Sequence, residues 1–342
     1  YGSYSHGYKA GGPNPPGAIL LNAIAFGDGQ ISTPIHPLTF KPEFVDAFEI
    51  GSKNTLMDGA LTLNGSAFYY NYENYQISEI VDRTSINLNF DAHVKGAEVE
   101  ANWEPVPGLR GNVAGGCEDT ALAKGSKAVD LIDRTAGDPN WVVVKPPPTQ
   151  ASNCIIPTYV LQYQLTAGGY VVAADCSSYI LNTDPATGLP YTPDTAGLLD
   201  RHGNVIQPGQ YAGFDPSTAP NGCAGIDTGL RDNDLPHAPR FTVSAGAQYT
   251  VPLSSDWAGT LRGDFYWQDN SWARVFNDDP YDRIHGYTNL NLTLIFTNQN
   301  GWQVMLYDKN VFNTTAITGT FLNSDDTGLT TNVFLTDPKL IG

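Results

Sequence analysis

The composition of this 342-residue chain is that of a β protein with little charge. Apolar residues make up 41% of it and charged residues only 15%, against roughly 25% charged in ordinary soluble domains. The formal net charge of −17 argues against a nucleic-acid partner, because such binding requires cations that neutralise phosphates. No run of about 18 apolar residues occurs, so the sequence holds no candidate transmembrane helix.

Segments that alternate apolar and polar residues recur along the chain and predict antiparallel strands. The clearest is Arg240–Val251, where the alternation places apolar side chains on one face of a strand and polar ones on the other. Its length exceeds the usual soluble strand of about 4–8 residues and suits a strand tilted across a bilayer. In chain order, the predicted strands are Tyr1–Lys9, Phe44–Leu56, Gly59–Ile77, Val94–Trp103, Leu109–Cys117, Arg240–Val251, Thr260–Gln268, Thr288–Phe296, Trp302–Lys309 and an incomplete one over Asn332–Gly342.

The connections between these strands alternate between short and long. Because the two kinds alternate, all long loops are expected at one end of the sheet, as in an up-and-down outer-membrane barrel. A Greek-key sandwich or a propeller gives no reason for that pattern. The sequence therefore predicts an all-β, antiparallel transmembrane β-barrel with long extracellular loops. The short connections are 57–59, 104–108, 252–258 and 297–301, and the long ones are 10–42, 78–93, 118–239, 269–285 and 310–331.

Five motifs in this order resemble the C-terminal half of TonB-dependent outer-membrane receptors. They are YGSYSHGYKAGG (Tyr1–Gly12), FKPEFVDAFEIGSKNTLMDGALTLNGSAFYYNYENYQI (Phe40–Ile77), VKGAEVEANWEPVPGL (Val94–Leu109), GYTNLNLTLIF (Gly286–Phe296) and WQVMLYDKNVFN (Trp302–Asn313). The resemblance implies a barrel of about 22 strands with a plug in its lumen and coupling to the TonB energy complex through that plug. It also implies the outer membrane of a Gram-negative bacterium, with membrane lipid around the barrel.

The chain is expected to be part of a longer protein. It begins inside a predicted strand and contains neither plug nor coupling box. We therefore interpret residues 1–342 as about ten C-terminal strands of the barrel, with 118–239 as a long extracellular loop insertion.

Charged residues on the predicted lumen face are candidate plug or transport-path contacts. These residues are Glu49, Lys53, Glu98, Glu100, Arg262 and Asp264. Their simplest role is to hydrate the lumen or to pair with the plug, and a contact with the transported ligand is the alternative. No catalytic motif of the GxSxG, HExxH or P-loop kind occurs, so an enzyme is not expected.

Four cysteines predict disulfides rather than a zinc site, because they show no CxxC spacing. We predict the pairs Cys154–Cys176 and Cys117–Cys223, although four cysteines allow three pairings. No cofactor is expected. Three acidic loop segments (Asn277–Asp282, Arg231–His237 and Asn323–Gly328) could supply oxygen ligands for Ca²⁺, but none has the EF-hand spacing, and solvated turns are the simpler interpretation.

Tyrosines of the long loop could form an aromatic bed for a planar ligand such as a catecholate chelate, or could pack the loop's own core. They are Tyr159, Tyr163, Tyr170, Tyr179, Tyr191 and Tyr211. The resemblance implies TonB-dependent uptake of a scarce extracellular small molecule, most commonly a ferric siderophore. The alternative is a structural or adhesive outer-membrane protein whose 118–239 loop docks a partner protein.

Overall fold

The computed structural model describes residues 1–15, 37–81, 84–144, 153–158, 161, 219–323 and 328–342. The elements described in full are β-strands and two 3-10 helices, η1 (Met57–Gly59) and η4 (Pro220–Cys223). No helix in this part of the chain is long and apolar enough to cross a membrane.

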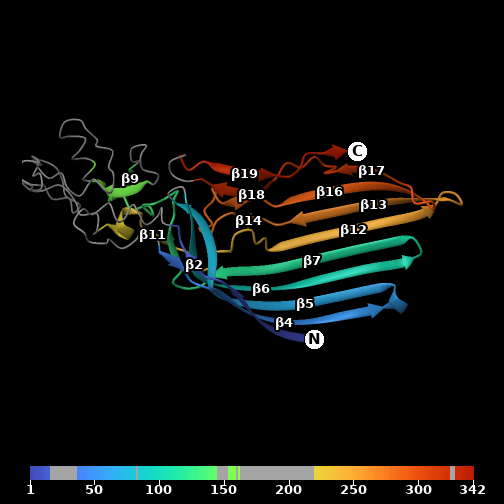
Figure 1. Ribbon diagram of the computed structural model, residues 1–342, viewed down its shortest axis with the longest axis horizontal. Helices are drawn as coiled ribbons and strands as arrows, with labels where there is room; N and C mark the ends of the chain where they lie inside the picture. The colour runs from blue at the N-terminus through green and yellow to red at the C-terminus, as the bar shows by residue number, and fades with distance from the viewer. Residues whose placement is uncertain (16–36, 82–83, 145–152, 159–160, 162–218, 324–327) are drawn as a thin grey trace, which may run out of the picture.

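One antiparallel sheet of ten strands organises the molecule (Figure 1). Every strand pairs with the next one of the sheet along the chain, which is the up-and-down order that the sequence predicts, and β1 and β20 form the two edges. In sheet order, the strands are β1 (Gly2–Lys9), β4 (Glu43–Leu56), β5 (Leu61–Val81), β6 (Thr84–Val106), β7 (Leu109–Leu122), β12 (Phe241–Pro252), β13 (Trp257–Gln268), β16 (Tyr287–Asn298), β17 (Gln303–Lys309) and β20 (Leu340–Ile341).

The register confirms that the two faces of the sheet differ in chemistry. Directly paired residues of antiparallel strands point to the same side, so each row of partners across the sheet shares a face. One row is apolar along most of its length, namely Leu63, Ala101, Val113, Ala245, Phe265 and Leu290. The neighbouring row holds Lys53, Asn64, Glu100, Ala114, Ser244, Tyr266 and Asn289. We call the face of Ala245 the outer face and the face of Ser244 the inner face.

The β5–β6 connection differs from the sequence prediction. The segment 78–93, expected as a loop, belongs to the two strands, which pair as far as Val81 and Thr84. A bulge between Tyr72 and Tyr75 shifts the register, and Asn74 takes a positive φ of 57° there. The apolar residues of β6 change from the outer face, at Ala97, Val99 and Ala101, to the inner face over Ile86–Val94, which is why the alternation assigned to this strand did not reveal its beginning.

The long insertion at 118–239 is also partly regular. Strand β7 continues to Leu122, and the described part of the insertion forms two small sheets, at the left of Figure 1. They pair β8 (Lys127–Val129) with β11 (Asp227–Gly229), and β9 (Trp141–Val144) with β10 (Cys154–Pro157).

Three further short sheets lie in the other long connections, and one corrects the predicted C-terminal strand. They pair β2 (Gly12–Pro13) with β3 (Thr39–Phe40), β14 (Ser271–Trp272) with β15 (Arg283–Ile284), and β18 (Ile317–Leu322) with β19 (Thr331–Leu335). Thus Thr331–Leu335 joins a loop hairpin, and only Leu340–Ile341 pairs with β17 in the main sheet.

The main hydrophobic core sits on the inner face at the end of the sheet that carries the long loops. Phe90, Ala92 and Val94 of β6 and Leu122 of β7 are buried there. They pack with loop residues that fold back over the strands, namely Ala128, Leu230, Leu235 and Val275. The loops therefore cover the strand ends and enclose space between them.

Candidate ligand-binding pocket

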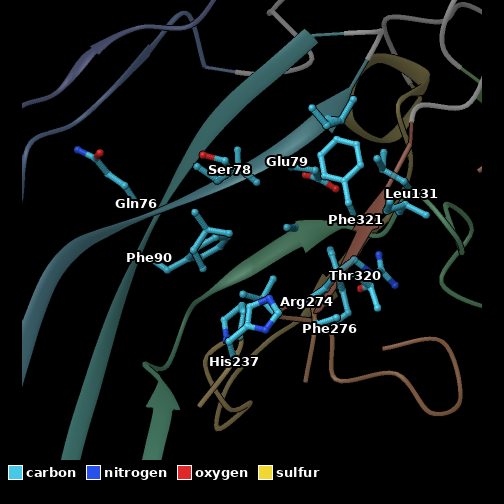
Figure 2. Close-up of a pocket in the computed structure, with 18 of the residues that line it drawn as sticks. Gln76, Ser78, Glu79, Phe90, Leu131, His237, Arg274, Phe276, Thr320 and Phe321 are labelled. Atoms are coloured by element: carbon cyan, nitrogen blue, oxygen red, sulfur yellow. The ribbon is translucent and has the colours of Figure 1, made fainter. Parts of the chain in front are cut away.

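A pocket of about 380 Å³ lies between the β5–β6 hairpin and the loops that fold over it (Figure 2). The bulge positions its strand wall, because the extra residue in β5 turns Tyr75 and Ile77 to the face of their partners Phe90 and Leu88, toward the inner-face core. The Asn74 N–H donates to Asp91 Oδ1 across 2.9 Å and holds the bulge. The lining residues are Tyr75, Gln76, Ile77, Ser78, Glu79, Ile80, Leu88, Phe90, Ala128, Leu131, Pro236, His237, Ala273, Arg274, Val275, Phe276, Thr320, Phe321 and Leu322.

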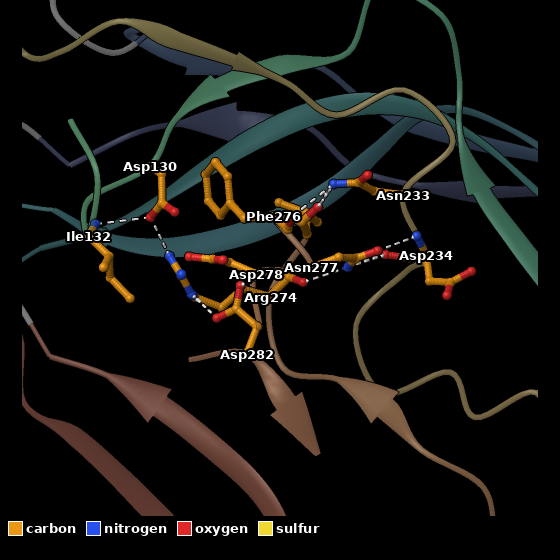
Figure 3. Close-up of polar contacts among 10 residues, drawn as sticks. Asp130, Ile132, Asn233, Asp234, Arg274, Phe276, Asn277, Asp278 and Asp282 are labelled. Carbon is orange, nitrogen blue, oxygen red and sulfur yellow. Dashed lines mark hydrogen bonds and ion pairs between the residues drawn. The ribbon is translucent and has the colours of Figure 1, made fainter. Parts of the chain in front are cut away.

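Arg274 ties the loops together behind the pocket (Figure 3). Its Nη1 donates to Asp130 Oδ1 across 2.6 Å, and its Nε donates to Asp282 Oδ1 across 2.5 Å. Asp130 and Asp282 are both buried, and Arg274 is 16% exposed. The guanidinium also lies 5.0 Å over the ring of Phe276. One cation thus joins the loop after β8 to the β14–β15 connection.

Amides and backbone groups extend this tie to the segment before β12. Asn233 Nδ2 donates to the carbonyl oxygens of Val275 and Phe276 across 2.8 and 3.0 Å. The Asp234 N–H donates to Asn277 Oδ1 across 2.7 Å. Leu235 N–H in turn donates to Thr120 Oγ1 of β7 across 2.9 Å. The loop walls of the pocket are therefore anchored to one another and to the sheet.

Burial and charge pairing shift the pKa values of groups in these loops. Burial raises the pKa of the Asp234 carboxyl, although the charge of nearby Arg240 partly opposes it. Burial works to lower the pKa of Arg274, but the hydrogen bonds and charges of Asp130 and Asp282 outweigh it and raise that pKa above its ordinary value. Burial also raises the pKa of Asp282, although the charge and hydrogen bonds of Arg274 oppose it. Arg274 therefore stays a cation between two acidic side chains.

The six charged residues predicted for the lumen share the inner face. Four of them lie in the register of β4, β5 and β6. Glu49 pairs with Phe68, Lys53 with Asn64, Glu98 with Ser66 and Glu100 with Asn64, all on the same side. Arg262 Nε donates to Asp264 Oδ2 across 2.8 Å, and its Nη1 donates to Gln248 Oε1 across 3.1 Å. Gly246 leaves room for this pair, because a Cβ there would lie 2.9 Å from Asp264 Oδ1. None of the six lines the pocket, and their contact with a plug or ligand stays a prediction.

The predicted Cys117–Cys223 disulfide is wrong. Cys117 is a free, exposed thiol on the outer face, where its register partners are Ala97 and Phe241. A disulfide requires Cβ atoms about 3.5–4.5 Å apart, and strand β7 places this thiol on the membrane side of the sheet rather than among the loops. Cys154 is disulfide-bonded, but Cys176 lies outside the described residues, so the predicted Cys154–Cys176 pairing stays a prediction.

The other predicted sites have mixed outcomes. All six loop tyrosines lie outside the described residues. In the acidic segments, Asp282 pairs with Arg274, Asp279 with Arg283 and Asp232 with Arg231. No cluster of three or more metal-ligating side chains occurs in the described part of the chain. Calcium binding stays an untested prediction.

Sequence reasoning missed the pocket because most of its lining residues fell in segments interpreted as loops. Leu131, Phe276 and Phe321 are apolar residues in stretches rich in Gly, Asp and Asn. The available signal was the short apolar groups ARVF (Ala273–Phe276) and ITGTFL (Ile317–Leu322) within the long connections. Apolar side chains in a loop are stabilised when they pack against other apolar residues, and here they pack against the inner-face core.

The family follows from comparison with known sequences. The family model described as TonB dependent receptor-like, beta-barrel, matches residues 1–313. The chain belongs to the TonB-dependent receptor β-barrel family. It is accordingly an outer-membrane β-barrel segment, and the loops that carry the pocket correspond to the long connections of such barrels. Comparison with the curated proteins found no match.

A solved structure of a receptor shows the same fold. The ferric yersiniabactin uptake receptor FyuA from Yersinia pestis matches with a TM-score of 0.54 and 13% identity, over 99% of this chain and 33% of that one. The siderophore receptor PiuA from Acinetobacter baumannii matches with a TM-score of 0.49 and 14% identity, over 99% and 32% of the two chains. The chain thus spans about a third of the length of these receptors.

Proposed function

We propose that this chain is part of an outer-membrane transporter that captures an extracellular small molecule and passes it inward with energy supplied through TonB. Family membership supports the transport class. The observation that carries the proposal is the pocket, because it opens among the long connections, the extracellular end of such a barrel. Its volume lies within the roughly 300–1,000 Å³ of small-molecule sites.

The role of the chain's own residues in this function is to bind and position, without covalent chemistry. The hairpin wall of Tyr75 and Phe90 is fixed by the sheet, whereas the opposite wall depends on the Arg274 tie between loops. A ligand that packs against both walls would contact elements anchored at different places in the chain. Charged inner-face residues such as Arg262 and Asp264 would line the path below it or contact a plug.

Depletion of solutes from a defined medium tests the transport proposal. Strains carrying the whole gene, a deletion of it, or a deletion of tonB would be compared by mass spectrometry of the medium. We expect at least one solute to be consumed only when both the gene and tonB are intact. Consumption that continues without tonB would contradict the proposal. A parallel arm with radioactive iron under iron starvation tests the ferric siderophore predicted from the family resemblance.

A partner-docking role is not proposed. It rests on the 118–239 insertion, and most of that segment lies outside the described residues.

A further inference from the structure

The walls of the pocket are rich in aromatic and branched apolar side chains contributed by separate elements. Aromatic rings come from β5 (Tyr75), β6 (Phe90), the β14–β15 connection (Phe276) and β18 (Phe321). Ile77, Leu88 and Leu131 fill the surface between them. Figure 2 shows Phe90 and Phe321 on different sides of the space, together with a few polar groups such as Ser78 and Thr320. Such a wall gains free energy by covering an apolar ligand.

The charges around the pocket are unfavourable for an anion. Arg274 and His237 are the basic side chains among its described lining residues. Arg274 already binds two buried acidic side chains, Asp130 and Asp282, so its charge is already compensated. Arg274 Nη2 is a buried donor without a hydrogen-bond partner among the described residues, and a neutral acceptor could use it. An anionic ligand would lose its hydration there without gaining a cation whose charge is uncompensated, and burying an unpaired charge is costly.

From these two observations we infer that the pocket takes an uncharged organic molecule with an aromatic or branched aliphatic body, in preference to an anionic chelate. This inference rests on the proposed function, whose ligand class it narrows. Hydroxyl groups set the polar contacts such a molecule can make. Thr320, on the β18 side, supplies a hydroxyl to the lining. A ligand hydroxyl or carbonyl fits this set.

Two probes with the same ring system but different charge test whether the pocket prefers an uncharged ligand. The probes are 2-naphthol, which is uncharged at neutral pH, and 2-naphthoate, which has the same ring system and a carboxylate. Binding is measured by equilibrium dialysis on the whole protein, purified from outer membranes and held in amphipol. We expect 2-naphthol to bind at least about tenfold more tightly than 2-naphthoate, which corresponds to about 1.4 kcal/mol.

A matched pair of variants locates the binding. Thr320→Trp places a large ring in the pocket, whereas Thr318→Trp changes the same residue type on an exposed position of the same strand. We expect Thr320→Trp to weaken 2-naphthol binding at least about tenfold and Thr318→Trp to leave it unchanged.

Three results would overturn the inference: equal or tighter binding of 2-naphthoate, no binding of either probe, or equal effects of the two variants. The probe comparison on the unaltered protein stands even if a variant fails to fold. Dialysis needs neither TonB nor uptake. Failure of the probe preference therefore overturns the ligand class alone, whereas consumption of solute without tonB overturns the transport proposal alone.

Discussion

Arg274 and Asp130 lie 144 residues apart in the chain, yet Nη1 of one donates to Oδ1 of the other across 2.6 Å. With Asp282 on its Nε, this arginine is the point at which two long connections meet behind the pocket. Removing one member of a buried ion pair strongly destabilises the folded protein, because the remaining charge is left buried without a partner.

Replacing that arginine tests its role. Arg274→Ala leaves Asp130 and Asp282 buried without their cation, and we expect a loss of about 3–5 kcal/mol in the free energy that holds the loops in place. Amide hydrogen exchange reports it, as faster exchange at Lys127–Val129. Arg283→Ala is the control, since Arg283 in the same connection makes an exposed 3.4 Å pair with Asp279, and it should cost less than about 1 kcal/mol. If amide exchange at Lys127–Val129 is equally fast in the two variants, Arg274 does not hold the two loops together.

Neighbouring positions of β12 test the two faces of the sheet. Val243→Arg places a charge on the outer, lipid-facing side and should cost about 2–4 kcal/mol near the bilayer midplane. Ser244→Arg lies on the inner face beside Ala114 and Tyr266 and should cost much less. Urea unfolding of the protein refolded into lipid vesicles measures both. If the two substitutions cost the same, the assignment of faces is wrong.

Two glycines in short turns separate backbone strain from steric clash. Both have positive φ, +94° at Gly59 and +86° at Gly108. A Cβ at Gly59 meets nothing within 4 Å, whereas one at Gly108 would lie 2.5 Å from the Thr250 carbonyl oxygen. Gly59→Ala should therefore cost only the left-handed strain of about 1–2 kcal/mol. Gly108→Ala should cost clearly more in the same urea experiment, and a smaller cost than at Gly59 would contradict the turn packing.

Stability should depend on pH through Asp234. Burial raises the pKa of this carboxyl in the folded protein, so the folded state binds a proton more tightly than the unfolded state. The protein gains stability as pH falls through the raised pKa toward the ordinary value of about 4, and loses it as pH rises. Asp234→Asn removes this cost of ionisation. We expect its melting temperature to exceed that of the unaltered protein at pH 7, and the difference to shrink toward pH 4. If the difference in melting temperature between the two proteins grows as pH falls, the pKa of Asp234 is lowered in the folded protein and the prediction is wrong.

The free thiol of Cys117 gives a chemical test of the corrected disulfide. Denatured protein treated with an alkylating reagent, without reductant, should be modified at Cys117 and not at Cys154, which is disulfide-bonded. Peptide mapping by mass spectrometry identifies the modified residue. A Cys117–Cys223 cross-linked peptide would restore the pairing predicted from the sequence.

The sequence by itself determined most strands of the sheet, their order and their two faces. Period-two alternation is a local property: in a stretch such as Phe241–Pro252 it fixes which side chains face lipid, whatever the neighbours are. The alternation of short and long connections then fixed the up-and-down order and the end of the sheet that carries the loops. These features need only the pattern along one strand at a time.

Only the tertiary structure decided the pocket, the Arg274 tie and the state of Cys117. The bulge at Tyr72–Tyr75 adds a residue to β5 and turns Ile77 to the inner face beside Leu88, and both come to lie under the loops. Contacts between segments more than a hundred residues apart, such as Arg274 with Asp130, leave no periodic trace in either segment. They form because the loops must cover apolar inner-face residues and pair their buried charges, and that depends on the assembled sheet.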